Sequence, residues 1–422
     1  MLNESIEGIR RYYKGCDILL PDCYPQYFED GSTGHVRWCN SEYARVAAAL
    51  RPSWQMLLAS CWPDLSRDRK QRGIAPSWHD LRSQAFQALI HNAKGLNFYA
   101  WFDSQRFSSV ILGVPALGKT LFDIKELILE NTVPDGISIV TDPVHPQFQA
   151  GLKIHDGQCC ILAVNTSMKT LHVSFRLKDS FSGSLFTEGG TKTFTVSNGL
   201  FEDDFLPGET KLYFSSPETA SRLIASEETE KDIERHRANR KKPGNLIGRG
   251  EMFSIDYIRY GKNKELDPGV PVIRVSSEAL LWFNTVSGGS LCYLFDGLTE
   301  PNRPEYGWRP RDNDKSPWLE IRLSGPAALN EIVLYTPAGN LKAGKIVVGD
   351  KVFPFENKIG ETEIRIPLEK TVSDLVRIEC TAFSYPEQGD EIARRLLLTE
   401  VEIYGIEAKE TAVKDQISSE KK

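Results

Sequence analysis

The sequence lacks the short motifs that identify several large classes of protein. It contains no run of about 20 apolar residues, the length that a membrane-spanning helix needs. Its first residues, MLNESIEGIRRYYKG, hold no apolar segment typical of a secretory signal peptide. GxSxG, phosphate-loop and dinucleotide-binding motifs are also missing, which disfavours a serine hydrolase, a kinase and a dehydrogenase.

Signatures of metal and nucleic-acid binding are also scarce. The eight cysteines show no CxxC spacing, which disfavours a zinc site and favours buried free thiols over a disulfide framework. The net charge of -6 gives no support for a nucleic-acid partner. Aromatic residues, in contrast, are plentiful. Eight tryptophans among 10% aromatics fit either a chain that handles sugar-like faces or one with surplus core aromatics.

Residues 78–105 predict a helix followed by a strand that ends at polar groups. Ser77 with Asp80 three positions later is a capping pattern that marks the start of a helix. Apolar residues then recur on one helical face, and Gly95 is placed where the helix should stop. The apolar run after it predicts a strand buried on both faces. Asp103 follows at the carboxyl end, where parallel α/β folds bind ligands.

Three such strands alternate with helices in the first part of the chain. The runs CDILLPDCYP, WQMLLASCW and LNFYAWF are spaced about 40 residues apart, which predicts βα repetition and a parallel sheet. A complete eight-stranded barrel takes about 250 residues, and about 130 are present here. We therefore expect a truncated barrel, which the start in mid-pattern favours, or else a small and complete open α/β layer.

The pattern then changes to all-β. Short alternating runs predict a small antiparallel β-sandwich over residues 134–216, after a partial (β/α) barrel over residues 1–133. Residues 217–243 are acidic first and basic last, which is the order that the helix dipole favours, and they predict a solvated linker helix. Further short strands predict a β jelly roll over residues 244–408, and the polar residues 409–422 predict a disordered tail. The expected fold class is therefore multidomain.

Four motifs in the last block follow one family pattern. They are YLFDG (293–297), GWRPRDNDKSPWLEIRL (307–323), LNEIVLYT (329–336) and LLLTEVEIYG (396–405). In its DG turn, its tryptophans and its closing strand the block resembles a discoidin, or coagulation-factor type C, domain. That family is a galactose-binding-like jelly roll often used as a carbohydrate-binding module. The resemblance covers about 140 residues and implies a polysaccharide or glycan partner.

The same resemblance implies two sites. Family members often hold a structural calcium ion near the DG turn, and the matching carboxylates are Asp296 and Glu400. Two carboxylates alone cannot establish it, because calcium takes six to eight oxygens. The alternative is that Asp296 only shapes a turn and Glu400 is an ordinary strand residue. For a sugar, Trp308 could stack on the ring, unless it is a core residue, while Arg309 and Arg311 could bind hydroxyls.

Residues 1–110 carry a second resemblance. The segment LRSQAFQALIHNAKGL (81–96) is similar to the pattern that enters the last strand of beta-galactosidase-like barrels, and the three apolar runs resemble strands six to eight of a glycoside-hydrolase TIM barrel. This implies hydrolysis of O-glycosidic bonds, which needs two carboxyl groups across the sugar. In the related barrels these come from the fourth and seventh strands. Here the fourth strand is missing, and WQMLLASCWPD has no glutamate at its end.

Residues at the three strand ends are the remaining candidates for chemistry. The candidate catalytic carboxylates are Asp22, Asp64 and Asp103, and the candidate stacking residues beside them are Tyr24, Trp62 and Trp101. Helix caps, loop turns and barrel packing are the alternatives. Two functions therefore stay open: the C-terminal part of a glycoside hydrolase with a glycan-binding module, or a non-catalytic carbohydrate-binding protein. Localisation is open too. A full-length enzyme of this kind would be extracellular or periplasmic, but no signal peptide is visible in this sequence.

Overall fold

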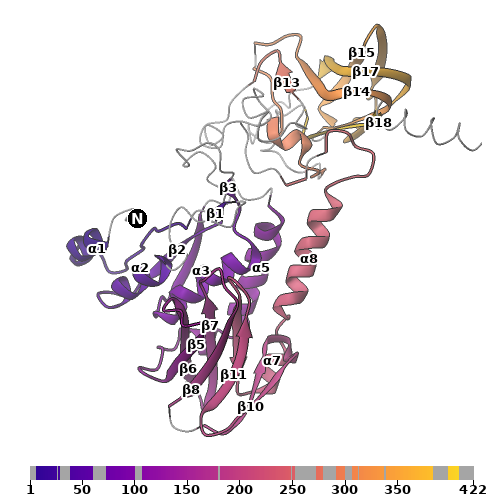
Figure 1. The fold of residues 1–422 in the computed structure, drawn as a ribbon. Helices are drawn as coiled ribbons and strands as arrows, with labels where there is room; N and C mark the ends of the chain where they lie inside the picture. The colour runs from indigo at the N-terminus through magenta and orange to yellow at the C-terminus, as the bar shows by residue number, and fades with distance from the viewer. Residues whose placement is uncertain are drawn as a thin grey trace, which may run out of the picture. The chain divides into compact units, whose positions relative to one another are not determined.

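The chain forms two compact units, residues 1–235 and 236–422, in a computed structural model (Figure 1). The structure describes residues 6–25, 27–28, 39–59, 73–99, 107–178, 181–248, 250–251, 272–278, 291–299, 307–311, 313–336, 339–383 and 398–407. No helix within these stretches is long and apolar enough to cross a membrane. The predicted domain boundaries at residues 133, 216, 243 and 408 stay predictions.

The first unit begins with helices and parallel strand pairing. Its elements are α1 (Ile6–Tyr12), η1 (Tyr13–Gly15), β1 (Tyr27–Phe28), α2 (Cys39–Ala48), β2 (Trp54–Leu58), β3 (Gly73–Ile74), α3 (Trp78–Ile90), β4 (Gly95–Tyr99), α5 (Ser108–Asp123) and α6 (Lys125–Leu129). β2 pairs with β4 in parallel, and single parallel bridges join Leu19 to Ser53 and Asp22 to Met56. The parallel arrangement of the three apolar runs is therefore present, but the described strands do not show a barrel. β4 is half-buried rather than buried on both faces as predicted.

Local sequence determines both ends of α3. The Ser77 hydroxyl accepts a hydrogen bond from the Asp80 N–H at 3.1 Å, and the Asp80 carboxylate accepts one from the Ser77 N–H at 3.0 Å. The predicted capping box is therefore confirmed. The predicted stop at Gly95 is wrong, because the helix ends before Asn92, which takes a left-handed φ of 67°. Gly95 begins β4 instead, where a Cβ atom would lie 2.7 Å from the Trp54 ring.

Strands β5 to β12 of the first unit form an antiparallel β-sandwich. Its elements are β5 (Ile137–Asp142), β6 (Phe148–His155), β7 (Gln158–Asn165), β8 (Leu171–Leu177), β9 (Gly183–Thr187), η3 (Glu188–Gly190), β10 (Thr193–Val196), β11 (Leu200–Phe205) and β12 (Thr210–Phe214). One sheet has the order β10-β9-β12-β7-β6 and the other β11-β8-β5. The two sheets share an aromatic core, in which Phe175 stacks on Phe201 at 4.5 Å between ring centroids. The antiparallel strands predicted in this region are therefore present.

A second core joins the α/β part to the sandwich. Phe86 and Leu89 on α3 pack with Leu57 of β2 and with Leu162 and Leu212 of the five-stranded sheet. α3 therefore lies between the parallel strands and the sandwich. The chain continues into α7 (Pro217–Ser221) and α8 (Ser226–Asn239), so the predicted linker helix consists of two helices.

Lys153 of β6 is a buried cation in the first unit. Its side chain is fully enclosed, and its ammonium donates a hydrogen bond to the Glu130 carbonyl oxygen at 2.6 Å. Burial, reinforced by the charge of Lys94, lowers the pKa of Lys153 to about 8. The unfolded chain therefore binds one more proton than the folded chain between about pH 8 and the ordinary lysine value near 10.4.

We expect the Lys153→Met substitution to change how stability depends on pH. Because the pKa is lowered in the folded state, the wild-type free energy of unfolding gains a contribution as pH rises from 8 to 10, and the variant lacks this gain. At pH 7 the variant should be more stable by about 1–3 kcal/mol. Urea unfolding at pH 7 and pH 10 measures both effects, with the exposed Lys169→Met as control. An equal difference between variant and wild type at both pH values would contradict this account.

The second unit is built on one antiparallel sheet. Its elements are β13 (Val272–Val275), η4 (Leu291–Phe295), β14 (Trp318–Tyr335), β15 (Leu341–Val348), β16 (Lys351–Glu356), β17 (Glu363–Phe383) and β18 (Glu400–Glu407). The strand order is β13-β14-β17-β15-β16, and β18 also pairs with β14. A register shift between Arg322 and Ala327 divides β14, whose first half pairs with β13 and whose second half pairs with β18. The antiparallel β architecture predicted for the last block is therefore present.

Candidate functional sites

The predicted sugar-binding tryptophan lies in the core of the second unit. The Trp308 side chain is 0% exposed, its backbone forms an antiparallel bridge with Leu398, and its indole N–H donates to the Ser277 carbonyl oxygen at 2.9 Å. The ring offers no face to a sugar, so a stacking role would require it to leave the core. The placement matches the core alternative. Arg309 beside it is also buried.

Arg311 is the predicted sugar-binding residue that reaches the surface. Its backbone N–H donates to the Ser277 hydroxyl at 3.0 Å, and its Nε donates to the Glu278 carbonyl oxygen at 3.4 Å. The side chain is exposed, and a guanidinium carries five N–H donors. A planar group with several N–H donors can bind neighbouring hydroxyls of one sugar.

Asp314 connects Arg311 to the sheet, and the sequence analysis missed it. Its carboxylate accepts hydrogen bonds from the Ser276 hydroxyl at 2.6 Å, the Ser277 hydroxyl at 2.5 Å and the Ser316 N–H at 3.1 Å. Partial burial acts to raise the pKa of Asp314, but these hydrogen bonds outweigh it and hold the pKa below its usual value. Asp314 therefore holds together the loop that carries Arg311. In the sequence it stands in RDNDKSP, a segment that indicates only a turn.

The DG turn and the closing strand lie side by side, as the resemblance implies. The Gly297 N–H donates to Glu400 Oε1 at 3.2 Å, and both Asp296 and Glu400 are buried. Asp296 Oδ1 accepts from the Leu298 N–H at 2.9 Å, and Asp296 Oδ2 lies 3.5 Å from the Arg240 guanidinium. These oxygens are directed at nitrogen donors. Among the residues that the structure describes, no group of three or more His, Cys, Asp or Glu side chains could hold a metal ion.

The strand-end candidates of the first unit are only partly described. Asp64, Asp103, Trp62 and Trp101 lie outside the described residues, so their convergence on one rim stays a prediction. Asp22 is buried at the end of the first apolar run, where it bridges to Met56 of β2. Burial raises the pKa of Asp22, and the nearby Tyr24 hydroxyl partly opposes that rise. The Tyr24 ring is stacked on Tyr99 at 5.4 Å.

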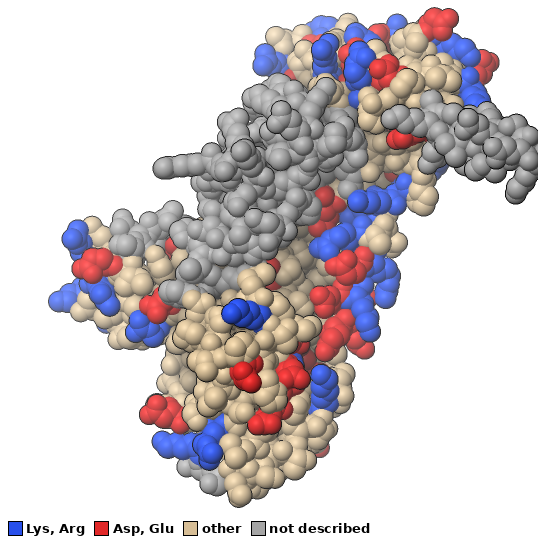
Figure 2. All heavy atoms as spheres, viewed as in Figure 1, with Lys and Arg blue, Asp and Glu red and all other residues tan. Residues whose placement is uncertain are grey.

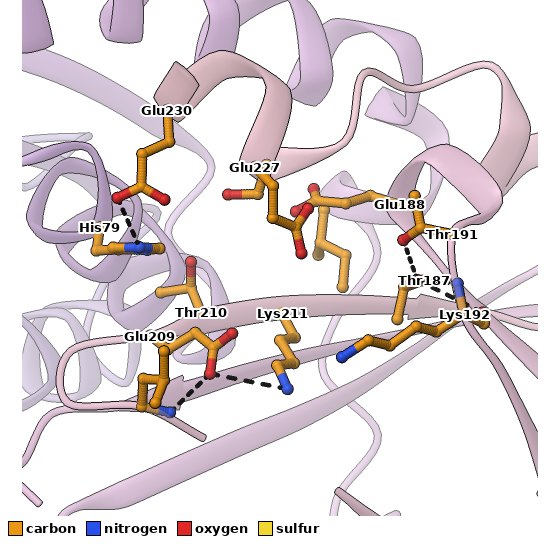
Figure 3. A pocket seen from close by; sticks show the side chains of 13 residues that line it. His79, Thr187, Glu188, Thr191, Lys192, Glu209, Thr210, Lys211, Glu227 and Glu230 are labelled. Atoms are coloured by element: carbon orange, nitrogen blue, oxygen red, sulfur yellow. Dashed lines mark hydrogen bonds and ion pairs between the residues drawn. The ribbon is translucent and has the colours of Figure 1, made fainter. Parts of the chain in front are cut away.

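The first unit also contains a cavity of about 210 Å³ (Figure 3). Glu227 and Glu230 of α8 lie on one side of it, and Lys192 and Lys211 lie on the other. Glu230 pairs with His79 at 3.4 Å, and Lys211 pairs with an aspartate of β11 at 2.8 Å. The described residues that line the cavity include no Phe, Trp or Tyr, so it lacks the aromatic face on which a sugar stacks.

The described part of one face carries charges of both signs. On the face shown in Figure 2, lysine and arginine side chains alternate with aspartate and glutamate, and no extended area has a single sign. A nucleic-acid backbone is bound by a continuous basic surface.

Comparison with known proteins finds carbohydrate-binding modules among similar structures. No family model and no curated protein matches the chain. A fucose-binding module of Streptococcus pneumoniae is 20% identical, with 31% of this chain and 91% of that chain covered and a TM-score of 0.24. A putative chitobiase fragment of Bacteroides thetaiotaomicron is 19% identical, with 32% and 93% covered and a TM-score of 0.25. A Clostridium perfringens domain in complex with GalNAc-β-1,3-galactose is 11% identical, with 32% and 94% covered and a TM-score of 0.23. The sugars named here are ligands of those proteins.

Proposed function

We propose that the second unit is a glycan-binding module of the discoidin-like, galactose-binding-like type. The observation that carries the proposal is the assembly of the separated motifs. Gly297 of the DG turn hydrogen bonds with Glu400, Trp308 pairs with Leu398, and β14 pairs with β18 in one sheet. These contacts place the four segments of the resemblance around one core.

The glycan would bind beside Arg311 rather than on Trp308. Arg311 supplies exposed donors, and Asp314 with its two serine partners fixes the loop on which Arg311 stands. Charge-assisted hydrogen bonds to a pre-positioned guanidinium are worth about 1.5–3 kcal/mol each.

Hydrolysis is not part of the proposal. Asp22 is the one candidate catalytic carboxyl group within the described residues. Glycoside hydrolysis requires two carboxyl groups on opposite sides of the scissile bond. The described strands of the first unit do not show a barrel, so we propose the non-catalytic alternative rather than the enzyme.

We expect the full chain to bind at least one class of glycan on a glycan array, and the Arg311→Ala substitution to weaken that binding about 10- to 100-fold. The melting temperature should stay unchanged, because the side chain is exposed. Arg322→Ala is the matched control, since Arg322 is 52% exposed on β14 and pairs with surface Asp374. Absence of binding to every glycan would refute the function. Equal affinities of wild type and Arg311→Ala would refute the placement of the site.

A further inference from the structure

Asp296, one of the two carboxylates implied for calcium, already faces a cation that belongs to the chain. Arg240 follows α8 directly, and its side chain is 2% exposed. Its Nε donates to the Asp296 backbone oxygen at 2.7 Å, and its terminal nitrogens lie 3.5 Å from Asp296 Oδ2 and 3.6 Å from Glu251 Oε1. Glu251 and Asp296 are themselves buried, so one guanidinium serves two enclosed carboxylates.

The backbone fixes Arg240 in this position. Gly297 has a left-handed φ of 77°, and a Cβ atom there would lie 2.1 Å from the Arg240 carbonyl oxygen. The DG turn therefore packs directly on the Arg240 backbone. Its glycine is required by this contact as well as by the turn.

A lysine two residues later repeats the arrangement on the closing strand. The Lys242 ammonium pairs with Glu402 Oε1 at 2.5 Å and donates to the Tyr335 hydroxyl at 3.1 Å. Glu402 is 1% exposed. Burial acts to lower the pKa of Lys242, but the contacts with Glu402 and Tyr335 outweigh it and raise that pKa. Residues 240–242 thus supply two cations to the DG turn and the closing strand.

We propose that the Arg240 guanidinium is the resident cation of the DG-turn site and takes the role that the resemblance implies for calcium. Calcium needs six to eight oxygen ligands at 2.3–2.6 Å. Here the Asp296 backbone oxygen and one carboxylate oxygen accept N–H donors, and the other carboxylate oxygen faces a positive charge. A divalent ion at these oxygens would have to displace the guanidinium. Two positive charges would then lie close together in a buried site. The second unit therefore folds without bound calcium.

The first test compares the full chain in EDTA and in 1 mM calcium chloride. We expect equal melting temperatures for the second unit and no calorimetric binding of calcium tighter than about 1 mM, because the guanidinium already pairs with Asp296. A calcium-dependent rise in melting temperature of the wild type would overturn the proposal.

The second test separates the charge of Arg240 from its packing. Arg240→Gln removes the cation and should lower the melting temperature by roughly 5–10 °C. Arg240→Lys keeps the charge, so its melting temperature should fall by clearly less. Calcium should raise the melting temperature of Arg240→Gln and leave Arg240→Lys unchanged. Equal losses of melting temperature in the two variants would overturn the role of the charge. Failure of both variants to fold would overturn it too. Arg237→Gln is the control, because Arg237 contacts Glu251 from a position that is 38% exposed.

Discussion

Replacing Arg82 by alanine is expected to lower the free energy of unfolding of the first unit by about 3–5 kcal/mol. Arg82 on α3 is 1% exposed and forms a two-pronged ion pair with Glu188, at 2.6 and 3.0 Å. Its Nε also donates to the Thr210 hydroxyl at 2.8 Å, and its guanidinium lies 4.9 Å from the centroid of the Phe86 ring. The substitution leaves a carboxyl group buried without a counter-charge.

The expected loss depends on pH because of Glu188. Burial raises the pKa of Glu188 even though the Arg82 guanidinium acts to lower it. Without Arg82 the folded-state pKa rises further above the unfolded value, so the folded variant holds a proton that the unfolded chain releases. Stability of the variant therefore falls as pH rises through and above the ordinary glutamate value near 4.3. Urea unfolding of Arg82→Ala should show a larger deficit at pH 7 than at pH 4.5.

Two further variants isolate the buried pair. The double variant Arg82→Met with Glu188→Leu should recover most of the lost stability, because no unpaired charge remains. Lys119→Ala, which removes an exposed i,i+4 pair with Asp123, should change stability by less than about 1 kcal/mol. A cost below about 1 kcal/mol for Arg82→Ala, or strictly additive losses in the double variant, would show that the ion pair is not the source of the stability.

Local signals predicted more of the fold than of the sites. The capping box at Ser77 and Asp80 uses residues three positions apart, and alternation in LHVSFRL matches the alternating burial of β8. Such patterns depend on backbone geometry over a few residues. The end of α3 is predicted at the wrong residue because Asn92 and Gly95 can both follow the last turn of a helix. Packing of β4 on Trp54 distinguishes them.

Buried charge pairs could not be predicted in the same way. Arg82 and Glu188 are separated by 106 residues, and Arg240 and Asp296 by 56. Periodicity marks a face as buried but does not name the partner of a charge on it. The basic end of α8 fits a solvated helix from composition alone, yet Arg240 just beyond it is enclosed. Local sequence thus indicates where α3 begins and which face of β8 is buried, while tertiary contacts determine which polar residues meet.

Replacing Trp308 by alanine is expected to lower the free energy of unfolding of the second unit by about 3–5 kcal/mol. The indole is the largest fully buried side chain of the described core, so its removal leaves a cavity. The substitution also leaves the half-buried Ser277 carbonyl oxygen without its indole donor. Trp308→Phe keeps most of the apolar volume and should cost about 1–3 kcal/mol. Denaturant unfolding followed by circular dichroism measures these losses.

Because Trp308 is a core residue, a loss of glycan binding in Trp308→Ala does not by itself locate the binding site. A Trp308→Ala variant that neither folds nor binds would report on the core, whereas Arg311→Ala tests the binding surface in a folded protein. Val372→Ala provides the control for truncation in the same unit, because Val372 is 63% exposed and should cost less than about 0.5 kcal/mol. If Trp308→Ala kept wild-type stability and still lost glycan binding, the indole would have to contact the sugar directly. The core placement of Trp308 and the assignment of Arg311 would then both be wrong.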